Sequence, residues 1–186
     1  MEKFVPRTDL AREAHAIAAA EGALNGVIAR EDYINGFPVT RVEVLDEAAS
    51  QLLCKPFGKY FTLDFEKLTK REENSFSDCV FALSQLLKEL LGNANSVLVV
   101  GLGNEAITPD AIGPWALDYV LVTRHLKLKG YSEFDGFASV SALRPGVLGT
   151  TGLEAADITA LLAGEIHPEA IIVIDALASA EPENLC

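Results

Sequence analysis

Cysteine and histidine are scarce in this chain of 186 residues, which contains three of each. Cys54, Cys79 and Cys186 are far apart, form no C-x-x-C pair and have no histidine at the spacing of a metal site. This pattern disfavours a disulfide framework and favours a reducing, cytoplasmic compartment. We expect Cys54 and Cys79 to pack in a core or on a helix face.

Basic residues are also few. Lys and Arg total 15 against 27 Asp and Glu, which gives a net charge of −12. Because phosphate groups would be repelled at long range, this balance opposes binding to DNA or to an anionic membrane. We therefore expect neither a nucleic acid nor a membrane as a direct partner.

Long apolar runs are absent as well. The longest, AIIVIDALA, is interrupted by Asp175 and is far shorter than the roughly 20 residues that span a bilayer. The N-terminal stretch MEKFVPRTDLAREAH mixes acidic with basic residues and has no apolar core of signal-peptide length. The sequence predicts neither a membrane span nor a secretory leader.

The sequence does contain enough apolar residues, 49%, for one compact domain over residues 1–186. Its first half predicts a helix over 8–21, because alanine is abundant and Thr8 or Asp9 can cap the start. Period-two alternation predicts a strand over 39–44, after the Asn35-Gly36 turn, and a second strand in GKYFTLDFE. Antiparallel pairing of these two strands is plausible.

The second half alternates strands with helices. Apolar residues at steps of three and four predict a helix from Phe76 to Leu90 that Gly92 ends. After it come a buried strand SVLVVGL, a helix over 109–123, a weaker strand GFASVSA, a glycine-rich loop RPGVLGTTG, a helix LEAADITALLAGEI and a buried strand AIIVIDALAS. This order predicts an α/β fold, a three-layer sandwich around a mixed, largely parallel sheet.

The turn VLVVGLGNEAITPDAIGP has two interpretations. Gly101, Gly103 and Ala106 match a G-x-G-x-x-A dinucleotide fingerprint, but that chemistry needs a helix to begin at the second glycine. Here Thr108 as N-cap and Pro109 as first helical residue place the helix start further along the chain. Since no suitable acid for a ribose is evident either, nucleotide binding is the weaker interpretation.

The stronger interpretation concerns two acids. Asp110 follows VLVVGL and Asp175 ends AIIVID. If the two strands are neighbours, both carboxylates lie at the edge of the sheet where ligands bind. One carboxylate could then activate water while the other, protonated, polarises a carbonyl. The alternatives are that Asp110 only complements a helix dipole and that Asp175 is only a strand-end residue.

Other candidates are weaker. The three histidines, His15, His125 and His167, are scattered, and we expect His125 and His167 to be surface or capping residues. Ser139, Ser141 and Ser179 lack the G-x-S-x-G elbow of a serine hydrolase. The sequence therefore predicts no metal, no cofactor and no serine or cysteine nucleophile.

Long motifs in register resemble one known family over essentially the whole chain. They are RTDLAREAH, VTRVEVLDEAASQLLCKPFGKYFTLD, VLVVGLGNEAITPDAIGP, LVTRHL, RPGVLGTTGLEAADI and VIDALAS. Their order and spacing resemble those of the germination protease family of spore-forming bacteria, also called spore protease. The resemblance implies an atypical aspartic endopeptidase with a fold like that of hydrogenase-maturation peptidases, a phosphorylase/hydrolase-like fold.

The resemblance also implies specific roles. The family's two catalytic aspartates correspond to Asp110 and Asp175, and we expect Gly103 and Asn104 to shape the site floor. Family members form homo-oligomers in the spore core, need no cofactor and degrade small acid-soluble spore proteins, cutting after acidic residues, mainly Glu. They are zymogens, so residues 1–9 would be a propeptide and Asp9-Leu10 the processing bond.

The chain ends soon after the second aspartate, whereas family members continue further, so it resembles their N-terminal portion and we expect it to be truncated at the C-terminus. Two alternatives follow. One is a nickel-dependent maturation-type peptidase on the same fold, and the other is an inactive fragment that only binds its protein target.

Overall fold

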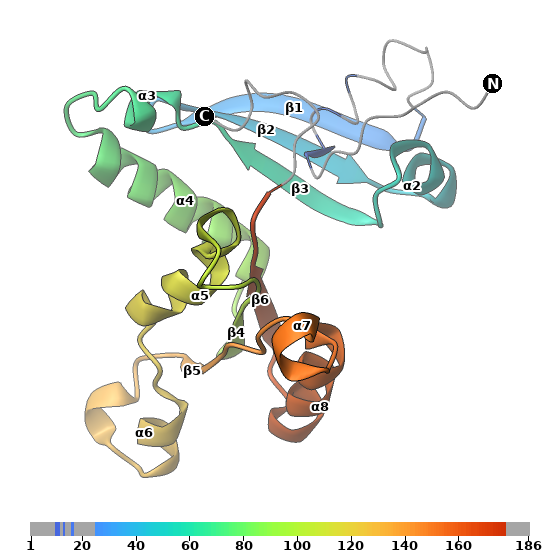
Figure 1. Cartoon of the computed structure of the whole chain (residues 1–186). Coiled ribbons are helices and arrows are strands. Elements are labelled where there is room, and N and C mark those ends of the chain that lie inside the picture. Colours follow the sequence, from blue (N-terminus) through green and yellow to red (C-terminus); the bar gives the residue numbers. More distant parts are fainter. Residues whose placement is uncertain (1–9, 12, 14–15, 17–24, 178–186) are drawn as a thin grey trace. The chain divides into compact units, whose positions relative to one another are not determined.

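The computed structural model describes residues 10, 11, 13, 16 and 25–177, and it divides the chain into two compact units (Figure 1). Residues 1–90 and 177–186 form one unit, here called the antiparallel unit after its sheet. Residues 91–176 form the other, here called the parallel unit. The α/β class is confirmed, but the described strands form two separate three-stranded sheets instead of one mixed sheet.

The antiparallel unit contains the strands β1 (Val27–Ile34), β2 (Phe37–Val44) and β3 (Gly58–Leu63), in that order across the sheet. Asn35 and Gly36 join β1 to β2 with φ angles of 52° and 82°. Positive φ at both central residues is typical of a type I′ hairpin turn, and the Asn-Gly pair favours this turn type. The two predicted strands and their antiparallel pairing are confirmed.

The helices of this unit are α2 (Glu47–Leu53), α3 (Glu66–Thr69) and α4 (Ser75–Leu91). Asp46 caps α2, because its carboxylate accepts a hydrogen bond from the Ala49 N–H at 2.8 Å. Three residues of the predicted helix over 8–21 are described as helical, and most of that helix lies outside the described residues. The core of the unit consists of Ala11, Val42, Val44, Ala49 and Leu53.

Helix α4 confirms the predicted helix, which ends before Gly92 at a φ of 57°. Its buried residues are Ser75, Ala82 and Leu86. The predicted apolar stripe is exposed instead, at Phe76, Val80, Leu83, Leu87 and Leu90. The spacing of apolar residues therefore predicted the helix correctly, but these apolar residues do not lie on its buried face.

The parallel unit contains β4 (Ser96–Gly101), β5 (Ser139–Leu143) and β6 (Ala170–Ile174), with β4 in the centre of the sheet. Both neighbours run parallel to β4. The helical segments between them are η1 (Thr108–Asp110), α5 (Ile112–Ala116), η2 (Leu117–Tyr119), α6 (Arg124–Leu128), η3 (Ser132–Phe134), α7 (Leu148–Thr151) and α8 (Ala155–Ile166). From β4 the chain passes to β5 on one side of the sheet and then to β6 on the other side, so the direction of strand order changes at β4.

The predicted continuous helix over 109–123 is wrong, since the chain forms η1, α5 and η2 there. Pro114 explains the break, because it has no N–H to bond the carbonyl of Asp110 in an α-helix. The predicted cap is also wrong: Ile107 precedes η1, and Thr108 lies inside it. The glycine-rich loop is partly helical, as α7.

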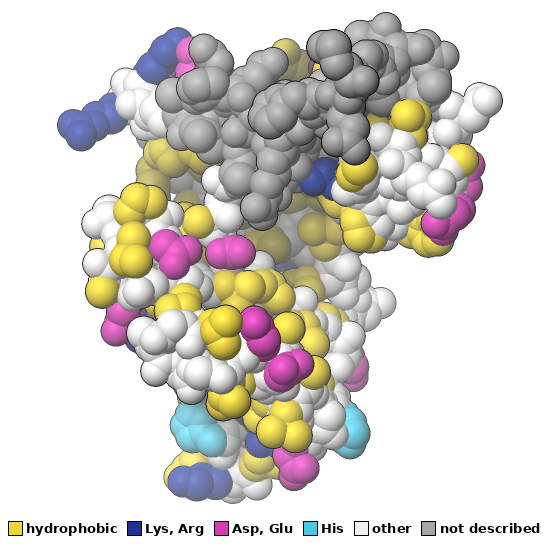
Figure 2. All heavy atoms as spheres, turned by 45° about the vertical axis from the view of Figure 1, so that its right-hand side comes forward, with side chains coloured by type: hydrophobic (Ala, Val, Ile, Leu, Met, Phe, Trp, Pro, Cys, Tyr) yellow, Lys and Arg dark blue, Asp and Glu magenta, His cyan; other side chains and the backbone are white. Residues whose placement is uncertain are grey.

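The apolar residues of the parallel sheet are unequally buried. Leu98 and Val100 of central β4 are fully buried, while Val97 and Val99 pack with Leu117, Ile172 and Ile174. The prediction that β6 is buried on both faces is wrong, because Ile171 and Val173 are about half exposed. As an edge strand, β6 has only β4 beside it among the described strands. Figure 2 shows many hydrophobic side chains on the surface.

Thr123 anchors the start of β5. Its side chain is buried, its hydroxyl donates to the Ala138 carbonyl at 2.5 Å, and the Val140 N–H donates to that hydroxyl at 2.9 Å. We expect Thr123→Val to lower the free energy of unfolding by about 2 kcal/mol, because it leaves two half-buried backbone groups without this partner. Urea unfolding followed by Trp115 fluorescence measures this. Thr123→Ser keeps the hydroxyl and should cost less. A valine variant as stable as the parent would show that the hydroxyl is not a structural anchor.

Candidate active site

Three loops meet at the carboxyl edge of the parallel sheet. The turn Leu102–Asp110 follows β4, Arg144 follows β5 directly, and Asp175 follows β6 directly. Since the three strands are parallel neighbours, these segments lie at one edge of one sheet. At a strand-order switch this edge is the usual position of a ligand site in open α/β sheets.

Glycines allow the backbone to pack closely at this edge. Gly103 has a φ of 115°, and a Cβ at this position would lie 1.9 Å from the carbonyl oxygen of Asp110. A Cβ on Gly113 would lie 2.1 Å from the carbonyl oxygen of Leu102 and 2.4 Å from that of Ile174. The glycines therefore join the turn after β4 to α5 and to the end of β6.

This geometry disfavours the dinucleotide interpretation. After Gly103 the chain makes a turn in which the Ala106 N–H donates to Asn104 Oδ1 at 3.0 Å. The next helical segment begins at Thr108, not at the second glycine. No helix N-terminus is therefore positioned at the glycines to receive a pyrophosphate. The glycine spacing serves backbone packing instead.

Asp110 is half-buried at the end of η1, with its carboxylate turned back toward the glycine turn. Its Oδ2 accepts a hydrogen bond from the Asn104 N–H at 2.7 Å. This bond fixes the carboxylate and leaves Oδ1 without a hydrogen bond to the described residues. Asn104 also lines a pocket together with Gly103.

Asp175 directly follows β6, the neighbour of β4, and is exposed. Its Oδ1 accepts from the Ala176 N–H at 2.8 Å. The Leu102 N–H donates to the Ile174 carbonyl at 2.8 Å, so the chain just before Asp175 is joined to the glycine turn that packs on Asp110. The two acids thus flank the same turn, because β4 and β6 are neighbours.

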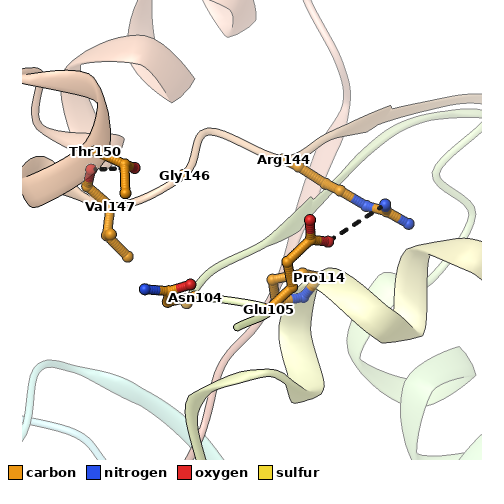
Figure 3. A pocket seen from close by; sticks show the side chains of 8 residues that line it. Asn104, Glu105, Pro114, Arg144, Gly146, Val147 and Thr150 are labelled. Carbon is orange, nitrogen blue, oxygen red and sulfur yellow. Dashed lines mark hydrogen bonds and ion pairs between the residues drawn. The ribbon is translucent and has the colours of Figure 1, made fainter. Parts of the chain in front are cut away.

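A pocket of about 320 Å³ opens beside Asn104 (Figure 3). It is lined by Gly103, Asn104, Glu105, Pro114, Arg144, Gly146, Val147 and Thr150. In Figure 3 the Glu105 carboxylate points toward the Arg144 guanidinium above Pro114. The Asn104 and Val147 side chains lie on the other side of the pocket. The pocket therefore offers a carboxylate, a guanidinium and an amide next to Asp110.

The sequence interpretation missed Arg144 and Glu105. Arg144 Nη1 lies 4.0 Å from Glu105 Oε2, and its Nη2 donates to Asp118 Oδ1. The available signal was the Arg-Pro-Gly sequence immediately after a strand. A strand end places its next residue at the ligand edge of a parallel sheet, whether that residue is acidic or basic.

The remaining candidates lie elsewhere. His125 is exposed in the last turn of α6, and His167 is the exposed C-cap of α8, as expected of surface and capping residues. Cys54 is exposed at the end of α2, so its predicted packing is wrong. Cys79 lies half-buried on α4, where burial raises the pKa of its thiol.

Several sequence candidates, among them His15, Ser179, Cys186 and Asp9 of the processing bond, lie outside the described residues. Among those that the structure describes, no three His, Cys, Asp or Glu side chains gather as they would around a metal ion. In the same part of the chain, no helix is both long and apolar enough to cross a membrane.

Comparison with known proteins gives a consistent result. A curated protein named germination protease from Caldanaerobacter subterraneus is 42% identical to this chain, over 96% of the chain and 56% of the relative. Another, from Bacillus cytotoxicus, is 39% identical over 100% of the chain and 53% of the relative. One from a Geobacillus species is 40% identical, over 100% and 54%. The chain thus spans about half the length of the curated relatives it matches.

The profile of the germination protease family matches residues 5–185, a range that includes Asp110, Asp175 and the residues that line the pocket. The resemblance seen in the motifs is confirmed by this match and by the relatives. The chain belongs to the germination protease family.

Proposed function

We propose that this chain acts as an endopeptidase on small acid-soluble spore proteins, in the spore core during germination. Asp110 and Asp175 would be its catalytic residues, and cleavage would follow acidic residues, mainly Glu. The observation that carries the proposal is the parallel pairing of β4 with β6. Asp175 directly follows β6, and Asp110 lies in the segment after β4, where it accepts a hydrogen bond from Asn104, a residue that lines the pocket.

The orientation of the carboxylates supports this role. In each acid one oxygen accepts a backbone N–H, from Asn104 for Asp110 and from Ala176 for Asp175. The second oxygen of each is then left for water or for substrate. Fixed orientation of this kind is what general acid–base catalysis needs, because a proton must be transferred over hydrogen-bond distance.

The reaction would proceed in two steps. One carboxylate takes a proton from water while the water oxygen attacks the carbonyl carbon of the substrate, and the other, protonated, gives its proton to the carbonyl oxygen. The carbon–nitrogen bond then breaks, and the leaving nitrogen receives a proton from the acid that took one from water, while one hydroxyl on the same carbon returns its proton to the second acid and becomes the carbonyl of the product. Both acids end in their starting states, without a covalent intermediate.

The chain would process itself by the same chemistry. The bond between Asp9 and Leu10 has an acidic residue followed by a hydrophobic one, as the proposed substrates do. Removal of residues 1–9 would then convert a zymogen to its mature form.

The test is incubation of the chain with a small acid-soluble spore protein in buffer alone, with a chelator, and with chelator followed by nickel. We expect the substrate to disappear at the same rate in all three, because the two acids suffice for the chemistry. Loss of cleavage in chelator and its recovery with nickel would favour a maturation-type peptidase. Binding of the substrate without cleavage in any condition would favour an inactive binding fragment.

A further inference from the structure

Arg144 is the one cationic side chain among the described residues that line the pocket beside Asp110. It follows β5 directly, at the same sheet edge as both aspartates. Asn104 connects it to the proposed chemistry, because Asn104 lines the same pocket and its N–H holds Asp110 Oδ2. A side chain bound in this pocket would therefore lie next to the reacting bond.

The two acidic partners of Arg144 are held differently. Asp118 accepts a direct hydrogen bond from Nη2. Glu105 lies at 4.0 Å from Nη1, the outer limit of an ion pair. The two carboxylate side chains are similarly exposed, Glu105 at 64% and Asp118 at 62%, so the hydrogen bond of Asp118 is what distinguishes them. Exposed pairs of this kind contribute little to stability. Asp118 thus orients the guanidinium, whereas Glu105 can turn to solvent at little cost.

We propose that Arg144 binds the acidic side chain of the substrate residue that precedes the cleaved bond. In the chain without substrate, the Glu105 carboxylate occupies the position that this substrate carboxylate would take. This inference rests on the proposed function, and it names Arg144 as the residue that determines the substrate specificity of that function. The guanidinium has five N–H donors in a planar fork, so it can keep Asp118 while it binds a second carboxylate. A glutamine side chain in place of that carboxylate would lack the charge.

The test measures binding separately from cleavage. A fluorescent peptide carries one glutamate followed by leucine, with the bond between them reduced so that it cannot be hydrolysed. A matched peptide has glutamine in place of the glutamate. Fluorescence anisotropy gives the Kd of both peptides for the parent chain and for the variants Arg144→Met and Glu105→Gln. Arg124→Met is the matched control, because Arg124 begins α6 and does not line the pocket.

We expect the parent chain and Arg124→Met to prefer the glutamate peptide by about tenfold, the size of a charge-assisted contact. Arg144→Met should bind both peptides equally, and Glu105→Gln should bind the glutamate peptide more tightly than the parent does. Circular dichroism checks the fold. If Arg144→Met does not fold, Glu105→Gln still tests the proposal.

A preference that survives in Arg144→Met, a weaker glutamate complex in Glu105→Gln, or no preference in the parent would each overturn the assignment of Arg144. None of these results depends on turnover. A chain that binds with the expected preference but never cleaves a spore protein would instead contradict the proposed peptidase activity and leave the assignment of Arg144 intact.

Discussion

We expect Asp110→Asn and Asp175→Asn each to lower the rate of spore-protein cleavage by about 10²–10⁴-fold, the usual contribution of a general acid or base. Asparagine has nearly the shape of aspartate and still accepts the N–H bond that orients each side chain, so the fold should be retained. What is lost is the ability to take or give a proton. The measurement is the initial rate of substrate loss on gels, for parent and variants at equal concentration.

Asp157→Asn is the matched control for this experiment. Asp157 is exposed in the first turn of α8 and does not line the pocket, so its variant should cleave at the parent rate. Far-ultraviolet circular dichroism confirms that each variant is folded. Cleavage at the parent rate by both Asp110→Asn and Asp175→Asn would refute the assignment of the pair.

Gly113→Ala should strongly destabilise the parallel unit. The new Cβ would lie 2.1 Å and 2.4 Å from two backbone carbonyl oxygens, those of Leu102 and Ile174. Neither is the end of a flexible side chain, so α5 would have to move away from the carboxyl edge of the sheet. We expect a loss of about 3 kcal/mol in the free energy of unfolding, at the upper end of overpacking effects.

Trp115 reports on this change directly, because it is the single tryptophan of the chain and lies in α5 with Gly113. Urea unfolding followed by its fluorescence gives the midpoint. Gly164→Ala is the control: Gly164 lies inside α8 with open space around it, so alanine there should stabilise the helix by about 1 kcal/mol. A Gly113→Ala variant as stable as the parent would mean that α5 does not pack on the sheet edge as described.

The sequence predicted most elements where a local rule determines the structure. The Asn35-Gly36 pair specifies a hairpin turn by its φ preferences, and Gly92 ends a helix for a similar reason. The prediction was wrong where one residue has an effect beyond its neighbours. Pro114 breaks the helix expected over 109–123, and neither periodicity nor composition showed that the strands would form two sheets.

The candidate site was predictable in part, for a physical reason. An acid directly after a strand, as Asp175 is, is visible in the sequence and lies at the sheet edge whichever strands are neighbours. Asp110 lies in η1, beyond the turn that follows β4. The proposed pairing of Asp110 with Asp175 requires that β4 and β6 are neighbours. The sequence does not show which strands are neighbours, so the pairing could be predicted only on that assumption. The pocket between Asn104 and Arg144 depends on loops about forty residues apart, and no local pattern indicates that such loops meet.

The most direct test of the proposed peptidase is mass spectrometry of both proteins after the chain is incubated with a small acid-soluble spore protein. The proposal predicts spore-protein fragments that end in glutamate, together with loss of residues 1–9 from the chain itself. An intact spore protein and an intact N-terminus would contradict it, provided that a longer germination protease digests the same substrate in parallel.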